Sequence, residues 1–281
     1  MSNTTTTLTG SAEQQQHFEK RVMWYTLFDC IKFVDQHSKQ TEMTQYVASD
    51  AEDYGQELTN KELEQRLLSI LRQSTTKKTA YCGQKFEGGY HTWKLPSTSG
   101  GTRTVKGQRD CVRRLKALVK VGNYSLRDKV VLDIGCNQGG CLVEIGDQIK
   151  FGIGVDVNPE LINCANRMAS HFHKRNLTFY TYDVDAQNGD FDTMLTFLPY
   201  KKPNIIFLLA VCQWIVNWKS LITWCYHNSL HLLFEDNGNK QQQKEHQHLL
   251  DQLYGAENVV DLRCRENGRV LLLCSKMKKS L

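Results

Sequence analysis

The sequence predicts an α/β fold: a seven-stranded, mostly parallel sheet with helices on both faces and a C-terminal antiparallel hairpin, preceded by an α-helical N-terminal extension. Three observations predict it. From Val130 onward, short apolar runs alternate with amphipathic runs, which is typical of a parallel sheet covered on both faces. Near the C-terminus, two apolar runs flank the turn signal Glu-Asn-Gly at 266–268. Residues 17–73 carry apolar side chains at helical spacing.

The predicted elements follow in chain order. The polar residues 1–16 are expected to form a disordered leader. Residues 17–104 are expected to form a helical extension and a loop that covers the cofactor or substrate, with Thr59 and Glu62 suited to a capping box. Residues 105–281 form the expected main domain, which begins with a basic helix that ends near Gly122. Its strands are predicted at 130–134, 151–155, 177–182, 204–210 and 230–235, and its helices at about 139–148, 159–174, 218–228 and 241–254.

Composition excludes several classes of protein. No apolar run approaches the roughly 18 residues of a membrane span, and the N-terminus lacks the basic and apolar regions of a secretory signal, so we expect a cytoplasmic protein, with the nucleus as an alternative. The ten cysteines include no Cys-x-x-Cys pair, so no metal site is predicted. His246 and His248 are expected on a solvated helix.

Positive charge is concentrated in one segment. Residues 77–129 contain thirteen Lys or Arg against three acidic residues. Basic residues interleaved with aromatic ones suit a path for RNA, with Arg113, Arg114 and Lys116 on phosphates. A merely solvated basic face is the alternative.

The stretch "VVLDIGCNQGG" at 130–140 is typical of a buried strand that runs into a turn holding a nucleotide-like cofactor. A dinucleotide fingerprint needs Gly-x-Gly-x-x-Gly, and Asn137 stands at its middle glycine. The stretch "GIGVDV" at 152–157 ends in Val157 where the third glycine should be. No Gly-Lys-Ser/Thr follows either turn, which excludes a P-loop.

A different pattern does fit. Asp133-x-Gly135-x-x-x-Gly139 is followed about 20 residues later by Asp156, where an acid at the end of the second strand accepts ribose hydroxyls. An acid after the third strand would reach the adenine amine. Asp183 and Asp185 both stand there, and Asp183 is favoured. Tight packing of the turn and a plain turn at Asp156 remain the structural alternatives.

The stretches "VVLDIGCNQGG", "GIGVDVNPELINCAN", "YTYDVDA" and "IIFLLAVCQWIVNW" resemble, in order and spacing, the motifs of class I S-adenosylmethionine-dependent methyltransferases. The resemblance covers about 105–277 and implies an enzyme that uses S-adenosylmethionine. It implies that Gly135 and Gly139 flank the methionine part. It also implies that Asp156 binds the ribose. The further cofactor residues that it implies are Asp183 and Val184 at the adenine, with Asp133, Asn137, Val157, Ala210, Tyr90 and Arg109.

Arg109 has two interpretations: it pairs with the carboxylate of the cofactor, or it lies on a solvated helix N-terminus. Gln213, Glu235 and His91 are the candidate catalytic residues. Glu235 is equally suited to being a plain turn acid. Trp214 and Trp218, which are four residues apart, suit either an acceptor site or helix packing.

The fourth-strand segment also resembles the "KWIHLNW" stretch of RNA 5′-phosphate capping methyltransferases. Gln213 stands where that family has Lys, Val216 falls near its His, and the spacing to the final Asn-Trp is one residue shorter. These departures do not favour phosphate-methyl chemistry; the basic and aromatic segment makes RNA the leading acceptor, ahead of a small molecule and then a protein. A methyltransferase-like scaffold without activity is the remaining alternative.

Overall fold

The computed structural model describes residues 58–74, 86–97, 99–186, 191–266 and 268–276. The predicted leader, the first predicted helix and the start of the basic segment lie outside these residues. Among the described helices, none has the length and apolar character needed to cross a membrane.

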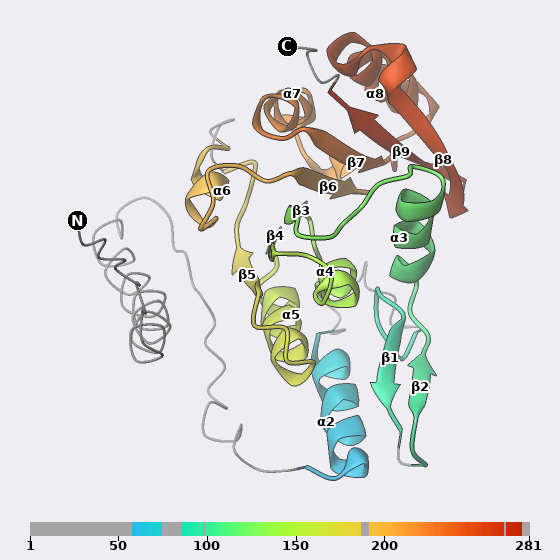
Figure 1. Ribbon diagram of the computed structural model, residues 1–281, viewed down its shortest axis with the longest axis vertical. Coiled ribbons are helices and arrows are strands. Elements are labelled where there is room, and N and C mark those ends of the chain that lie inside the picture. Colours follow the sequence, from blue (N-terminus) through green and yellow to red (C-terminus); the bar gives the residue numbers. More distant parts are fainter. Residues whose placement is uncertain (1–57, 75–85, 98, 187–190, 267, 277–281) are drawn as a thin grey trace, which may run out of the picture. The chain divides into compact units, whose positions relative to one another are not determined.

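The predicted fold class is confirmed. Seven strands form one sheet in the order β5-β4-β3-β6-β7-β9-β8, and within it β9 pairs antiparallel with both β7 and β8, which makes β8–β9 the C-terminal antiparallel hairpin (Figure 1). The strands are β3 (Val130–Ile134), β4 (Phe151–Asp156), β5 (Leu177–Thr181), β6 (Ile205–Leu209), β7 (His231–Glu235), β8 (Val259–Glu266) and β9 (Arg269–Ser275). The chain moves outward from β3 to β5 and then returns to β6 on the other side of β3. Open α/β sheets bind ligands at such a switch point, beyond the carboxyl ends of the strands.

Successive side chains of a strand point to opposite faces, so each central strand contributes to two cores. Val131 of β3 lies in the core on one face, and Leu132 lies in the core on the other. All five residues of β3 and of β6 are buried, as expected where helices cover both faces.

The helices divide between the two faces (Figure 1). One core contains residues of α2 (Asn60–Gln73), α3 (Cys111–Lys120), α4 (Gly140–Ile145) and α5 (Pro159–His171). The other contains residues of α6 (Thr193–Thr196), η3 (Cys212–Trp214), α7 (Trp218–Asn228) and α8 (Lys240–Tyr254); η4 (Ala256–Asn258) follows α8. The capping box at Thr59 and Glu62 is confirmed at the start of α2.

A small hairpin precedes the main sheet. β1 (Trp93–Pro96) pairs with β2 (Thr102–Val105), within the stretch where the sequence predicts a loop. Trp93 is buried and stacks on Phe172 at the end of α5, with 6.4 Å between ring centroids. The hairpin is thereby attached to the same face of the sheet as α5.

Two expectations about helices were wrong. α4 ends at Ile145, before the predicted end at about 148, and Gly146 is its C-cap residue. His246 is fully buried, although a solvated position was predicted. Its Nδ1 lies 3.1 Å from Asp236 Oδ1, and its ring meets Trp218 edge-on at 4.3 Å, while His248 remains exposed.

Candidate cofactor and acceptor site

The Gly-rich turn lies at the carboxyl end of β3, and its backbone explains its composition. Gly135, Asn137 and Gly139 have positive φ angles of 74°, 54° and 74°. A Cβ at Gly135 would approach Val211 Cγ2 to 2.7 Å, and one at Gly139 would approach Phe179 Cε1 to 2.6 Å. Backbone conformation and packing therefore require both glycines without any ligand. The case for a cofactor must rest on other residues.

Asp156 lies beside this turn, at the end of the neighbouring strand β4. Its Oδ2 accepts a hydrogen bond from the Asn137 N–H, and its Oδ1 accepts one from the Asn158 N–H, both at 3.0 Å. Burial raises the pKa of the half-buried carboxyl group, and these N–H donors act in the opposite direction. An ionised carboxylate has about four acceptor positions, so each oxygen keeps capacity for another donor.

Gln138 connects the turn to the segment before β1. The side chain is fully buried, and its Oε1 accepts from the N–H groups of Tyr90 and His91 at 3.0 and 3.3 Å. Its Nε2 donates to Ser74 Oγ at 2.7 Å, at the end of α2. The sequence did not single out Gln138; a long amide side chain inside a Gly-rich turn was the available signal.

Arg109 is not on a solvated helix N-terminus: its side chain is only 1% exposed. Its backbone N–H donates to the Tyr90 carbonyl at 2.7 Å, next to the Gln138 contacts. Nη1 lies 3.9 Å from Glu266 Oε2, too far for a hydrogen bond. Nε and Nη1 have no hydrogen-bond partner among the described residues, so a buried cation retains unused donors.

Buried charges lie between α3 and the sheet. Arg114 Nη2 contacts Glu235 Oε2 at 2.6 Å, so the interpretation of Arg114 as a surface phosphate ligand was wrong. Burial raises the pKa of Glu235, and Arg114 counteracts that rise. Glu235 is therefore a member of a buried ion pair, rather than an acid exposed at the edge of the sheet. Asp133 is buried as well, and burial raises its pKa to about 7.

The two acids after β5 have different environments. Asp185 accepts hydrogen bonds from the backbone N–H groups of Val216 and Asn217, which attaches its loop to the segment after β6. Asp183 is exposed and accepts from the N–H groups of Asp185 and Ala186. Val184, the other predicted adenine residue, lies between the two acids and is half-buried. Asp183 is thus the acid with more of its surface open to a ligand.

The end of β6 is strained and open. Ala210 has a φ of 58°, a conformation that a non-glycine residue rarely adopts outside turns and functional sites. Asn237 Nδ2 donates to its carbonyl at 2.6 Å, and Asn237 Oδ1 accepts from the Gln213 N–H at 3.1 Å. Beyond it the chain exposes Trp214 (55%) and Val216 (81%), so Trp214 does not belong to the helix core.

Val157 follows β4 and is 60% exposed. The carboxyl ends of β4 and β6 flank that of β3 in the parallel sheet, so exposed apolar side chains stand on both sides of the Gly-rich turn. His91, by contrast, is buried below the turn, where its ring contacts the backbone of Gly140.

A hollow of about 600 Å³ on the described surface lies elsewhere. Its lining includes Tyr124, Asp128 and Gln148, at the amino end of β3. It is opposite the edge that carries the turn and the acids, so it does not belong to the candidate site.

The chain resembles class I S-adenosylmethionine-dependent methyltransferases, as its motifs predict. The likeness lies in the strand order and in the acid at the end of the strand that follows the Gly-rich turn. No family model matches the chain. A curated relative, the U6 snRNA methylphosphate capping enzyme Amus of Drosophila melanogaster, is 30% identical over 122 residues, which cover 41% of this chain and 35% of that protein. The match therefore spans about a third of the relative's length.

Three solved structures illustrate the similarity in fold. The N-terminal domain of EvdMO1 with SAH bound overlaps 60% of this chain and 82% of that chain, at 10% identity and a TM-score of 0.48. Magnesium protoporphyrin IX methyltransferase (ChlM) from Synechocystis PCC 6803 with bound SAM overlaps 59% and 78%, at 14% identity and 0.43. The bifunctional kinase-methyltransferase WbdD overlaps 60% and 40%, at 18% identity and 0.43.

Proposed function

We propose that this chain is an S-adenosylmethionine-dependent methyltransferase and that its acceptor is RNA. The observation that carries the first part is the position of Asp156, at the end of β4 and directly beside the Gly135–Gly139 turn. Its free acceptor positions suit the two ribose hydroxyls of an adenosine. Asp183, with its exposed carboxylate, and the neighbouring Val184 are assigned to the adenine.

The residues around the turn also fit the amino-acid part of this cofactor. Arg109 is a buried cation with unused donors at Nε and Nη1, and a carboxylate is the partner that a guanidinium binds best. Tyr90 and Gln138 attach its segment to the turn. In this assignment the segment before β1 forms one wall of the cofactor site.

When bound, S-adenosylmethionine supplies a sulfonium methyl group that is already activated for in-line displacement. The chain therefore needs mainly to align the acceptor and exclude water. Gln213 lies at the end of β6, where its backbone is fixed by Asn237, and it is the polar side chain assigned to acceptor alignment. Glu235 is already paired with Arg114, and His91 with Cys111, so we assign them supporting positions and not direct contact with the acceptor.

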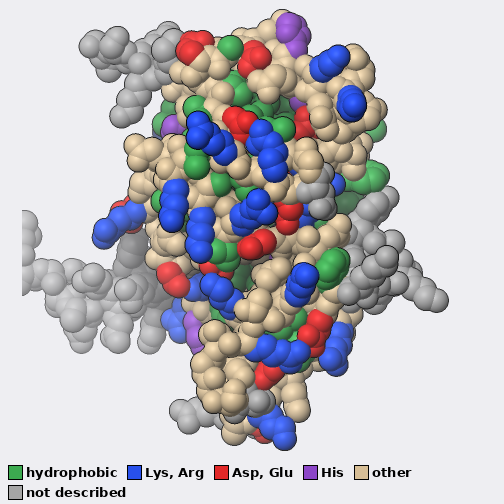
Figure 2. Space-filling model, turned by 90° about the vertical axis from the view of Figure 1, so that its right-hand side faces the viewer, with side chains coloured by type: hydrophobic (Ala, Val, Ile, Leu, Met, Phe, Trp, Pro, Cys, Tyr) green, Lys and Arg blue, Asp and Glu red, His purple; other side chains and the backbone are tan. Residues whose placement is uncertain are grey.

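Two features support RNA as the acceptor. Exposed Trp214 and Val216 offer flat and apolar surface beside the turn, and aromatic side chains stack on nucleobases. Arg113, Lys116 and Lys120 of α3 are exposed, and α3 packs against β8, which adds the exposed Arg263. Figure 2 shows many Lys and Arg side chains on one face of the molecule, with some acidic side chains among them. The curated relative, a snRNA capping enzyme, agrees with this acceptor class.

Calorimetric titration with S-adenosylmethionine and its demethylated product tests the cofactor. Asp156→Ala removes the acceptor for the ribose hydroxyls and should weaken binding by about 1 to 3 kcal/mol. Asp128→Ala is the matched control, because Asp128 is an exposed acid at the opposite end of β3. Unchanged affinity in Asp156→Ala would refute the ribose assignment, and no affinity in the unaltered protein would favour the inactive scaffold.

Salt-dependent RNA binding tests the acceptor. A variant with Arg113, Lys116 and Lys120 changed to Ala should bind RNA more weakly, and the slope of log affinity against log salt should fall by about 3. A variant with the exposed lysines Lys150, Lys201 and Lys240 changed to Ala is the control. Labelled methyl transfer to total RNA should be lost with binding. Transfer to a metabolite extract without RNA would instead favour a small-molecule acceptor.

A further inference from the structure

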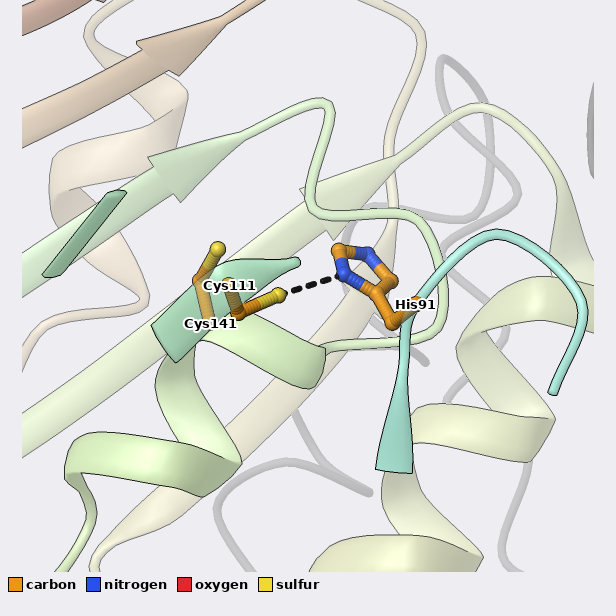
Figure 3. A group of neighbouring side chains, drawn as sticks. All are labelled: His91, Cys111 and Cys141. Atoms are coloured by element: carbon orange, nitrogen blue, oxygen red, sulfur yellow. Dashed lines mark hydrogen bonds between the residues drawn. The ribbon is translucent and has the colours of Figure 1, made fainter. Parts of the chain in front are cut away.

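Three potential metal ligands meet beneath the Gly-rich turn. His91 precedes β1, Cys111 is the first residue of α3, and Cys141 is the second residue of α4 (Figure 3). His91 Nδ1 lies 2.7 Å from Cys111 Sγ, and the three donor atoms all lie within 4.8 Å of one another. Residues from three separate segments thus direct one nitrogen and two sulfur atoms into a common space.

The group is closed to solvent: His91 is 3% exposed, and Cys111 and Cys141 are each 2% exposed. Burial disfavours the charged imidazolium of His91, and a neutral imidazole has a lone pair to offer a metal. Its Nε2 has no hydrogen-bond partner among the described residues. The ring thus has a hydrogen-bond contact between Nδ1 and Cys111 Sγ, while its second nitrogen is buried without one from any described residue.

We propose that His91, Cys111 and Cys141 bind a thiophilic divalent cation of the Zn²⁺ type. Two sulfurs with one imidazole form a donor set that suits Zn²⁺ better than Mg²⁺ or Ca²⁺. Binding forms two metal–sulfur bonds and one metal–nitrogen bond, and the two thiol protons go to solvent. A Zn²⁺ ion with two thiolates and a neutral imidazole adds no net charge to the interior.

The charge balance matters because the surroundings already contain buried ions. Arg114 interacts electrostatically with His91 and Cys111, and Asp133 interacts with Cys111. An uncompensated additional charge among these groups would be costly. A neutral metal–thiolate unit avoids that cost, whereas a bare cation would not.

The geometry requires only a small adjustment. Metal–sulfur and metal–nitrogen bonds of about 2.3 and 2.1 Å place tetrahedral donor atoms roughly 3.5 to 3.8 Å apart. The nitrogen–sulfur contact would have to open by about 1 Å, and any donor pair near the 4.8 Å limit would have to close by about as much. A water molecule would complete the fourth position. Because the site is closed, the ion would enter during folding, when the ligands are accessible.

An ion at this position would hold the segment before β1 against the cofactor turn. A Cβ on Gly140 would lie 2.6 Å from His91 Cγ, so the ring already packs directly on the backbone of the turn. The proposed metal would fix this ring to α3 and α4. The proposal depends on the fold and not on the methyltransferase assignment.

The test is spectroscopic. The full chain is first unfolded in denaturant with a chelator under reducing conditions, which removes bound metal. It is then refolded with Co²⁺. We expect one Co²⁺ per chain, with a thiolate-to-cobalt charge-transfer band and the visible bands of tetrahedral Co²⁺, both abolished by Zn²⁺. Cys111→Ser and Cys141→Ser should each remove the charge-transfer intensity. Cys225→Ser, at a buried cysteine on α7, should retain it.

Cys30 and Cys82 lie outside the described residues. The cysteine variants therefore decide which thiols bind Co²⁺. A second measurement needs no variant: Zn²⁺ should protect Cys111 and Cys141 in the unaltered protein from alkylation during partial unfolding, as read by peptide mass spectrometry. Absent cobalt bands, bands that persist in either cluster variant, or equal alkylation with and without Zn²⁺ would each overturn the site.

Discussion

The buried ion pair between Arg114 and Glu235 gives a sharp prediction about stability. Their side chains are 2% and 3% exposed, and Nη2 lies 2.6 Å from Oε2. Arg114→Leu would leave the Glu235 carboxylate buried without its closest counter-ion. Removal of one partner of a buried pair costs about 3 to 5 kcal/mol, because the other charge remains desolvated. We expect a loss of that size in the free energy of unfolding at pH 8.

The loss should depend on pH in a definite direction. Burial already raises the pKa of Glu235, and removal of Arg114 raises it further. A carboxyl group whose folded pKa lies above its unfolded value contributes stability at low pH that is lost as pH rises through the folded pKa. Arg114→Leu should therefore be less destabilised, relative to the unaltered protein, at pH 5 than at pH 8.

Urea denaturation of the unaltered protein, Arg114→Leu, Glu235→Leu and the double variant measures this coupling. The double variant should be more stable than Arg114→Leu alone, because no unpaired charge remains. Arg265→Leu is the control: it breaks the exposed pair with Asp261 and should cost no more than about 1 kcal/mol. A loss below 1 kcal/mol in Arg114→Leu, or strictly additive single losses, would refute the reasoning. A catalytic Glu235 would instead show itself as lost turnover in Glu235→Gln with stability retained.

Two further predictions concern the turn. Burial raises the pKa of Asp133 to about 7, so the stability that its protonated form contributes is lost as pH rises through 7. The unaltered protein should therefore be less stable at pH 8 than at pH 5, and Asp133→Asn should remove roughly 2 to 3 kcal/mol of that difference. Denaturation of both proteins at the two pH values checks this, and identical pH dependence would contradict it. Gly139→Ala forces a side chain into positive φ and against Phe179, and should lower the free energy of unfolding by about 2 kcal/mol or more. Gly100→Ala, with a φ of 83° and nothing within 4 Å of the added Cβ, separates the backbone cost from the clash; equal losses would exclude a packing role for Gly139.

The fold was predictable because its signals are local. Strands β3 to β7 lie within one or two residues of the predicted ranges, and α7 spans the predicted 218–228. Uninterrupted apolar runs, Asn158 before Pro159 and the Glu-Asn-Gly turn at 266–268 each act on their immediate neighbours. The helix limits were less accurate, since tertiary packing and caps such as Gly146 decide where a helix ends.

The candidate site was predictable only in part. The turn and Asp156 could be found because spacing along the chain brings parallel strand ends together. The environment of each side chain could not. A basic helix pattern does not distinguish exposed Arg113 from buried Arg114, and nothing near Arg109 indicates that it is buried with unused donors.

The sequence by itself determined the alternation of strands and helices, the conformation of the Gly-rich turn and the acid that follows it, because each depends on residues close together in the chain. The tertiary structure alone decided which ionisable groups lose their water. Arg114 and Glu235 are 121 positions apart, and His91, Cys111 and Cys141 come from three segments. Their pKa values and their capacity to bind a partner depend on desolvation and on distances that exist only after the helices pack on the sheet.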